Sequence, residues 1–128
     1  MQYTFVIEGK LPGQNEFIKA NRTNYYVGNK MKRDAQEMIM LAIRQQLKGV
    51  HIDMPVMIEY KYFEPNRRRD KDNVHAFASK VIQDALVKEG VLMNDGWRNI
   101  FGFTALFECD PQRPRIEVTI TLFGEVNL

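Results

Sequence analysis

Two aspartates separated by a single residue follow three consecutive arginines in the stretch RRRDKDN, residues 67–73. In an extended chain residues i and i+2 point the same way, so Asp70 and Asp72 would present two carboxylates to one side. Mg²⁺ commonly takes one or two protein carboxylates and completes its shell with water and substrate phosphate. The stretch is therefore compatible with a metal site beside a phosphate-binding cluster, but the spacing of the aspartates does not decide for it. The alternative is a salt cluster in which the arginines neutralise the aspartates and Asp72 caps a following helix.

The composition is that of one ordinary globular domain, residues 1–128, with 27% charged and 45% hydrophobic residues. The net charge of +2 permits a nucleic-acid partner without requiring one. Cys109 is the only cysteine, which excludes an internal disulfide and favours a reducing cytoplasm. The N-terminus has no basic segment before its short apolar run, and no run of about twenty apolar residues occurs, so we expect a cytoplasmic protein outside the membrane.

The elements that must position the aspartates follow from the hydrophobic periodicity. We expect an α+β domain with the order β-loop-α-β-α-β-β, in which two main helices pack on a mixed or antiparallel sheet. Glycine, proline and asparagine residues predict a long polar loop after the first strand, and an alternating strand leads directly into the cluster. The last two β-rich runs, separated by DPQRP, are expected to form a hairpin. The expected strands are 1–9, 54–66, 100–109 and 114–123, the expected helices are 30–47 and 73–90, and the loop is 9–24.

The stretch NRRRDKDN, followed by KVIQDALVKEGVLMND, resembles the signature of the RusA-type Holliday-junction resolvases, small endonucleases of phages and prophages. The resemblance is most specific over residues 63–100, and the remainder of the chain follows the family pattern more loosely. It implies a Mg²⁺-dependent endonuclease that cleaves four-way DNA junctions in recombination and repair, with Mn²⁺ as a possible substitute. It also implies a homodimer and no small-molecule cofactor. The alternative is a non-catalytic binder of branched or single-stranded DNA.

The resemblance also implies roles for four residues of this chain. Asp70, Asp72 and Asp95 would bind the metal, and Lys80 would assist catalysis. The chain departs from the family pattern at two positions: Asn94 replaces the first acid of the later turn, and Ala76 occupies the place of the family lysine, four residues after the second aspartate.

Lys80 is assigned by the downstream register, because it stands four residues before the aspartate of DAL. A continuous helix would place its Cα about 12 Å along the axis from Asp72, farther than a lysine comfortably spans. We therefore expect an extra turn, absorbed as a loop or bulge before Phe77, to bring Lys80 to the site. Otherwise His75 or Lys71 would supply the catalytic cation.

Further cationic and polar residues are candidates for contacts to DNA phosphates. Trp97 could pack against the turn beside it or stack on a flipped base. The strand sequence Glu59-Tyr60-Lys61 imitates part of a restriction-type nuclease site, but it is also the ordinary polar face of a strand. The predicted DNA-binding residues are Arg67, Arg68, Arg69, Lys71, Asn15, Lys19 and Arg22.

Overall fold

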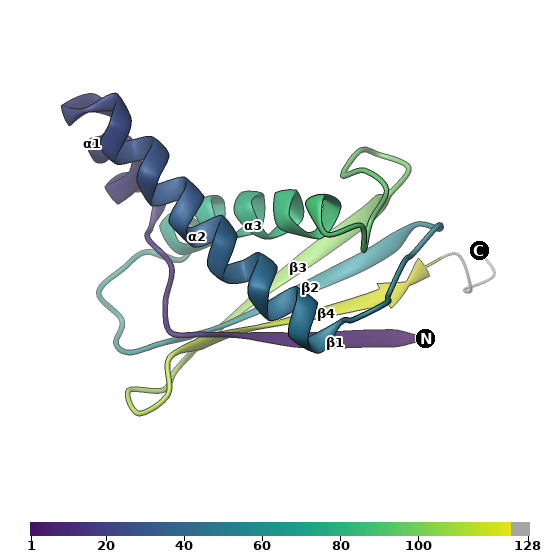
Figure 1. The fold of residues 1–128 in the computed structure, drawn as a ribbon. Coiled ribbons are helices and arrows are strands. Elements are labelled where there is room, and N and C mark those ends of the chain that lie inside the picture. The colour runs from purple at the N-terminus through teal and green to yellow at the C-terminus, as the bar shows by residue number, and fades with distance from the viewer. Residues whose placement is uncertain (124–128) are drawn as a thin grey trace.

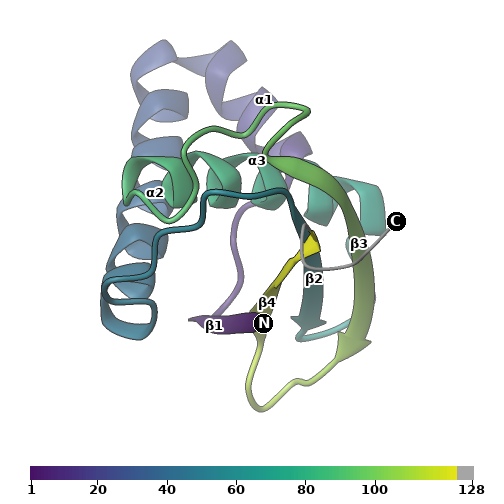
Figure 2. The same cartoon turned by 90° about the vertical axis from the view of Figure 1, so that its right-hand side faces the viewer.

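Four strands form a mixed sheet, and three helices lie on one of its faces, in the computed structural model, which describes residues 1–123 (Figures 1 and 2). The predicted α+β class is confirmed, as is the order of the strands and the two long helices. The elements are β1 (Gln2–Glu8), α1 (Gln14–Thr23), α2 (Tyr25–Gln46), β2 (Val56–Glu64), α3 (Lys71–Lys88), β3 (Ile100–Cys109) and β4 (Arg115–Leu122).

The strand order in the sheet is β1-β4-β2-β3. β4 runs antiparallel to both β1 and β2, whereas β2 and β3 are parallel neighbours joined by α3 as a crossover helix. The predicted hairpin of β3 and β4 is therefore wrong, because these strands lie on opposite sides of β2. The crossover places the start of α3 at the carboxyl end of β2, the end of a parallel strand at which α/β folds commonly bind ligands.

The core lies between the sheet and the helices. Along β2 the predicted alternation is confirmed: Val56, Ile58, Tyr60 and Tyr62 are buried towards the helices. α3 buries one apolar stripe against them, as its periodicity predicts. The buried residues of α3 are Val74, Phe77, Ala78, Val81, Ile82, Ala85 and Leu86.

The segment predicted as a polar loop is in fact the helix α1. Its first turn is stabilised by the Glu16 carboxylate, which accepts a hydrogen bond from the Gly13 backbone N–H at 3.2 Å. Its inner face buries Ala20 and places the ring of Phe17 against Phe77 of α3, with 5.3 Å between ring centroids. Tertiary packing of these apolar residues therefore outweighs the local turn signals.

α2 begins at Tyr25, five residues before the predicted start. Asn24 is its N-cap, and the Asn24 side chain accepts a hydrogen bond from the Tyr26 backbone N–H at 2.8 Å. None of the helices in residues 1–123 combines the length and the apolar character that crossing a membrane requires.

Candidate functional site

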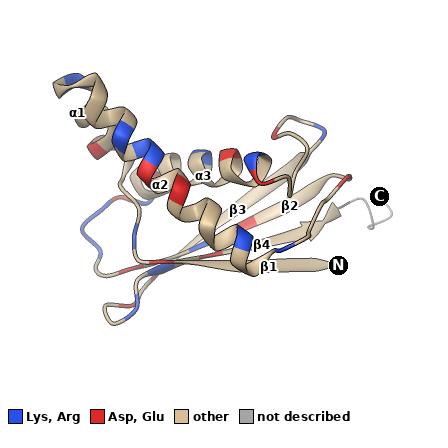
Figure 3. Ribbon diagram, in the orientation of Figure 1, with Lys and Arg blue, Asp and Glu red and all other residues tan. Residues whose placement is uncertain are grey.

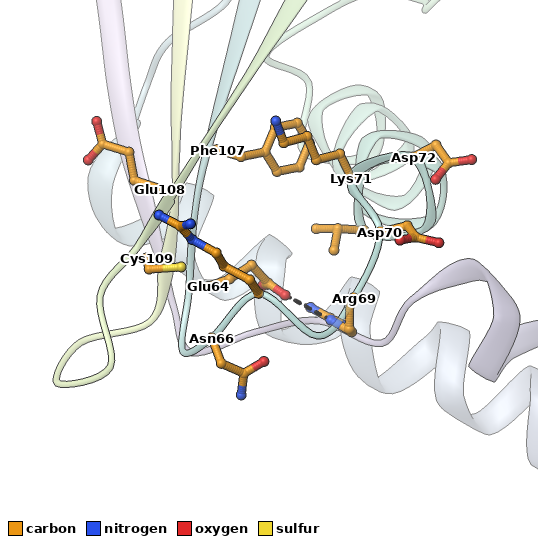
Figure 4. Close-up of a pocket in the computed structure, with 11 residues that line it drawn as sticks. Glu64, Asn66, Arg69, Asp70, Lys71, Asp72, Phe107, Glu108 and Cys109 are labelled. Carbon is orange, nitrogen blue, oxygen red and sulfur yellow. Dashed lines mark hydrogen bonds and ion pairs between the residues drawn. The ribbon is translucent and has the colours of Figure 1, made fainter.

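A hollow of about 820 Å³ opens where the end of β2, the start of α3 and the end of β3 meet (Figure 4). Asp70, Lys71 and Asp72 line it from the start of α3, and Arg67 lines it from the preceding loop. Lys and Arg residues are concentrated on this loop and on the N-terminal half of α2 (Figure 3). The lining of the hollow therefore includes the two predicted aspartates and cationic residues.

The loop between β2 and α3 is fixed by Arg69. Its guanidinium donates two hydrogen bonds to the buried Glu64 carboxylate, Nε to Oε1 at 2.8 Å and Nη2 to Oε2 at 2.9 Å. A third bond runs from Nη1 to the Leu11 carbonyl at 2.7 Å. Burial lowers the pKa of Arg69, but the hydrogen bonds and charge of Glu64 outweigh it and leave the pKa above its ordinary value. Arg69 is thus a permanently charged part of the scaffold.

Asp70 and Asp72 lie at the first turn of α3, which begins at Lys71 and not after Asp72 as predicted. Asp70 is in the N-cap position, but its side chain makes no capping hydrogen bond, whereas an Asp72 oxygen accepts one from the Asn73 N–H at 2.9 Å. Both are exposed, and both point away from Phe107 (Figure 4). The expectation of an extended DxD is wrong, but both carboxylates still point the same way at a helix N-terminus, where backbone N–H dipoles favour negative charge.

Asn73 joins the start of α3 to the start of α1. Its side-chain oxygen accepts a hydrogen bond from the Asn15 N–H at 2.7 Å. A Cβ at Gly13 would lie only 2.6 Å from the Asn73 side-chain nitrogen, so glycine allows this close approach. The asparagine of the DxDN stretch is therefore a structural link in this chain.

Lys71 extends to the opposite side from the two aspartates, over the ring of Phe107, with 5.8 Å between Nζ and the ring centroid (Figure 4). Arg67 and Arg68 are exposed and make no ion pair within residues 1–123. Arg67 and Lys71 line the hollow, so they, unlike the ion-paired Arg69, remain candidates for binding an anion there.

Asp95 and Lys80 form a second charged group, separate from the hollow. Lys80 Nζ lies 3.6 Å from an Asp95 oxygen and 3.1 Å from an Asp84 oxygen. The hydrogen bond and charge of Asp84, followed by those of Asp95, raise the pKa of Lys80, so this lysine carries its charge. The loop of residues 91–99 returns along α3 before β3 begins and brings Asp95 to Lys80 (Figure 2).

α3 is continuous from Lys71 to Lys88, so the predicted bulge before Phe77 does not occur. Lys80 remains about 12 Å along the helix axis from Asp72. In the described part of the chain no group of three or more His, Cys, Asp or Glu side chains is close enough to hold a metal ion. Two carboxylates at the start of α3 have the donor chemistry that Mg²⁺ prefers, and the binding of a metal by Asp70, Asp72 and Asp95 stays a prediction.

His75 lies half-buried among aromatic rings, and not at the surface. Its Nδ1 is 2.7 Å from the Tyr62 hydroxyl, and its ring meets Tyr60 and Phe103 at centroid distances of 5.2 and 5.5 Å. Burial lowers the pKa of His75, so the imidazole is neutral at pH 7. A neutral ring between α3 and the sheet is poorly suited to be the catalytic cation.

The remaining sequence candidates lie outside the hollow. Asn15, Lys19 and Arg22 are exposed on α1, a helix and not the predicted loop. Lys61, on the sheet face opposite the helices, pairs with Glu108 at 3.7 Å. Trp97 is fully exposed, so its predicted packing against the turn is wrong.

Sequence reasoning missed the wall that β3 contributes to the hollow. Glu108 and Cys109 line it because β3 pairs in parallel with β2, with Cys109 beside Glu64. No local pattern indicates this pairing. The crossover through α3 was the only signal for it, since strands joined by such a helix commonly lie parallel.

Comparison with known proteins identifies one family. The family model described as endodeoxyribonuclease RusA matches residues 9–121. The matched region contains the hollow, all of α1, α2 and α3, and the Lys80–Asp95 pair. No curated protein matches the chain.

Proposed function

This chain belongs to the endodeoxyribonuclease RusA family, and we propose that it is a metal-dependent endonuclease that cleaves four-way DNA junctions in recombination and repair. The observation that carries the proposal is the placement of Asp70 and Asp72 within a region matched to a nuclease family, beside exposed cations at a hollow. This arrangement joins a carboxylate pair for a hard cation to groups that can bind phosphate.

Asp70 and Asp72 would hold Mg²⁺, or Mn²⁺ in its place. When bound, such a cation polarises the scissile phosphate and lowers the pKa of the attacking water. The Asp70 carboxylate, which makes no capping bond, can turn towards a ligand without the loss of a helix cap. Arg67 and Lys71 would bind the phosphates on either side of the scissile one, while Arg69 keeps the loop in place through Glu64.

Asp95 and Lys80 would complete the site as the third carboxylate and the catalytic cation. The support for these roles is the family register, together with the pairing of the two side chains at 3.6 Å. Lys80 would stabilise negative charge that develops on the phosphate oxygens or on the leaving oxygen. For this, the metal and the scissile phosphate must lie over α3 between Asp72 and Lys80.

The test is cleavage of a labelled four-way junction in Mg²⁺ by the wild type and by Asp70→Asn. The variant should lose cleavage and retain binding or bind more tightly, because removal of a negative charge cannot weaken a phosphate contact electrostatically. Asp53→Asn, at an exposed aspartate outside the hollow, is the matched control and should cut normally. Mn²⁺ binding is measured by electron paramagnetic resonance. The affinity should fall in Asp70→Asn and stay at the wild-type level in Asp53→Asn.

Two outcomes would reject the proposal. Wild-type protein that binds junctions without cutting them in Mg²⁺ or Mn²⁺ would support the non-catalytic binder. Parallel loss of binding and cleavage in a folded Asp70→Asn variant would show that the aspartate supports the fold or the DNA contact, and not the chemistry.

We further propose that the active form is a homodimer. Resolution of a four-way junction requires two cuts related by symmetry, and this chain carries one DxD stretch. A two-fold dimer would supply one site to each strand. Sedimentation equilibrium of the protein without DNA tests this proposal, which requires a mass twice that of the chain.

A further inference from the structure

The Trp97 side chain stands out because it is fully exposed, at 100% of its reference accessibility. Tryptophan offers a large apolar surface, and a fully exposed indole gains nothing from the core of its own chain. Trp97 lies in the segment between Asp95 and β3, next to the exposed Arg98. Its position therefore suits contact with a partner molecule.

A second, smaller hollow of about 260 Å³ lies beside this indole. Trp97, Phe101 and Phe103 contribute its aromatic lining, and Asp95 also borders it. Phe101 and Phe103 point to the same face of β3, since one residue separates them. Their side chains are 57% and 54% exposed, respectively. The hollow therefore offers an aromatic surface that is open to solvent.

Both phenylalanine rings have aromatic neighbours within the chain. The Phe103 ring meets the buried Tyr60 at 6.4 Å and His75 at 5.5 Å between centroids. The Phe101 ring stacks on Phe123 at 3.7 Å. These contacts restrict the movement of both rings, while more than half of each side chain stays exposed for contact with a planar group.

Cationic side chains lie next to the aromatic ones. Lys80, whose side chain is 62% exposed, pairs with Asp95 at the border of the hollow, and Arg98 follows Trp97 directly. Aromatic rings for the bases, combined with cations for the backbone, are the composition of surfaces that bind unpaired nucleic acid. The small volume fits one planar ring system better than a protein segment.

We propose that Trp97, together with the hollow formed by Phe101 and Phe103, stacks on an unpaired or unstacked nucleobase of the DNA substrate. The inference rests on the proposed function, because it requires junction DNA as the ligand. A junction exposes base faces at its crossover point, and a linear duplex exposes them only at its ends. The stacked base would lie close to the Lys80–Asp95 pair, so the contact would position the strand for cleavage.

The experiment uses the natural fluorescence of the protein, since Trp97 is the only tryptophan. A four-way junction, a linear duplex of the same arm sequence and a single strand are titrated in EDTA, which prevents metal-dependent cleavage. Stacking should quench Trp97 emission on the junction and on the single strand, and much less on the duplex. Trp97→Ala should weaken junction binding about tenfold or more and leave duplex binding unchanged, whereas Trp97→Phe should retain most of the affinity.

Equal quenching by junction and duplex, or tight junction binding without quenching, would overturn the inference. So would a Trp97→Ala variant with normal junction affinity. A Trp97→Ala variant with half the mass of the wild type in sedimentation would instead assign the aromatic surface to contact between two copies of the chain. Quenching that persists in a protein unable to cut in Mg²⁺ would reject the proposed function alone, while absence of all DNA binding would reject both.

Discussion

At the scale of single residues, the chain divides its charged side chains between the scaffold and the exposed surface. Arg69 and Asn73 lie within the sequence that suggested chemistry, yet both hold elements together, through Glu64 and through Asn15. Asp70, Asp72 and Arg67 from the same stretch are exposed at the hollow. Sequence alone cannot separate these roles, because the difference depends on whether a partner side chain is within hydrogen-bond reach.

The first prediction concerns the cation that assists cleavage. Asp72, Ala76 and Lys80 follow one another at i, i+4 along the continuous helix, and Ala76 is exposed. Lys80→Ala should reduce the single-turnover cleavage rate by about 10² to 10³, the scale of the loss of one positioned electrostatic group. Ala76→Lys in the Lys80→Ala background should restore part of the rate, since it places a cation one turn closer to Asp72.

Lys71→Ala and His75→Ala are the comparison variants for that rate measurement. If Lys80→Ala cuts at the wild-type rate while Lys71→Ala is severely impaired, the catalytic cation is the one beside the hollow. His75→Ala should report only on packing, because the neutral imidazole lies among the aromatic rings.

The second prediction separates Arg69 from Arg67. Arg69→Ala leaves the Glu64 carboxylate buried without its partner and should lower the free energy of unfolding by about 3 kcal/mol. Arg67→Ala should change stability by less than about 0.5 kcal/mol. Arg67→Ala should also change the salt dependence of junction binding. The magnitude of the slope of the log binding constant against log salt concentration should fall by about one, as expected for the loss of one phosphate contact. Urea unfolding measures the stability effect, and junction titrations at several salt concentrations measure the slope. A change of slope in Arg69→Ala without a loss of stability would show that Arg69 contacts the DNA.

At the scale of elements, periodicity predicted the two long helices and the four strands, but it did not predict which strands pair in the sheet. Regular spacing of apolar residues reports which face of an element is buried, and this was sufficient for β2 and α3. The helix α1 was missed because Gly9, Pro12 and the asparagines were given more weight than the capping residue Glu16. The hairpin was wrong because strands next to each other in sequence need not pair, and β2 has β3 on one edge and β4 on the other.

The third prediction concerns the interface between α3 and the sheet, where His75 is half-buried. Its pKa is lowered in the folded state from the ordinary 6.5, so at pH 7.5 the imidazole is largely neutral in both states, whereas the unfolded chain is half protonated at pH 6.5. Below this value the unfolded chain takes up the proton first, and the free energy of unfolding should fall until the pH passes the folded pKa. Tyr60 and Tyr62 contact the ring, and burial raises the pKa of both, that of Tyr60 to about 12, so neither titrates here.

Chemical denaturation between pH 7.5 and 5 tests this pH dependence. The free energy of unfolding of His75→Gln should change less over that pH range than that of the wild type, because glutamine does not titrate. His51→Gln, at the other histidine of the chain, is the comparison variant, and the effect of His75→Gln should also appear in the His51→Gln background. Identical slopes for His75→Gln and the wild type would show that the histidine is protonated as readily in the folded chain as in the unfolded one.

At the scale of the whole molecule, the predictability of the site depends on how far apart its parts are in sequence. Asp70 and Asp72 could be placed together because they are neighbours in the chain. The position of Asp95 depends on how the loop of residues 91–99 returns along α3, and that of Cys109 on the parallel register of β2 and β3. Both are consequences of the crossover, a tertiary feature that local patterns do not encode.

The last prediction tests the proposed dimer through its chemistry. Wild-type protein and Asp70→Asn are mixed in equal amounts and allowed to exchange subunits. If each subunit of a two-fold dimer cuts one strand, about half of the dimers contain a single working site and about one quarter contain two. Mixed dimers should nick one strand and leave the other intact, so nicked junctions should accumulate under single-turnover conditions with excess protein. A plasmid-borne junction distinguishes the results, since one cut gives a nicked circle and two paired cuts give a linear product.

Independent monomers, by contrast, would let a second wild-type chain complete each nicked junction, and the linear product would eventually reach the level obtained without the variant.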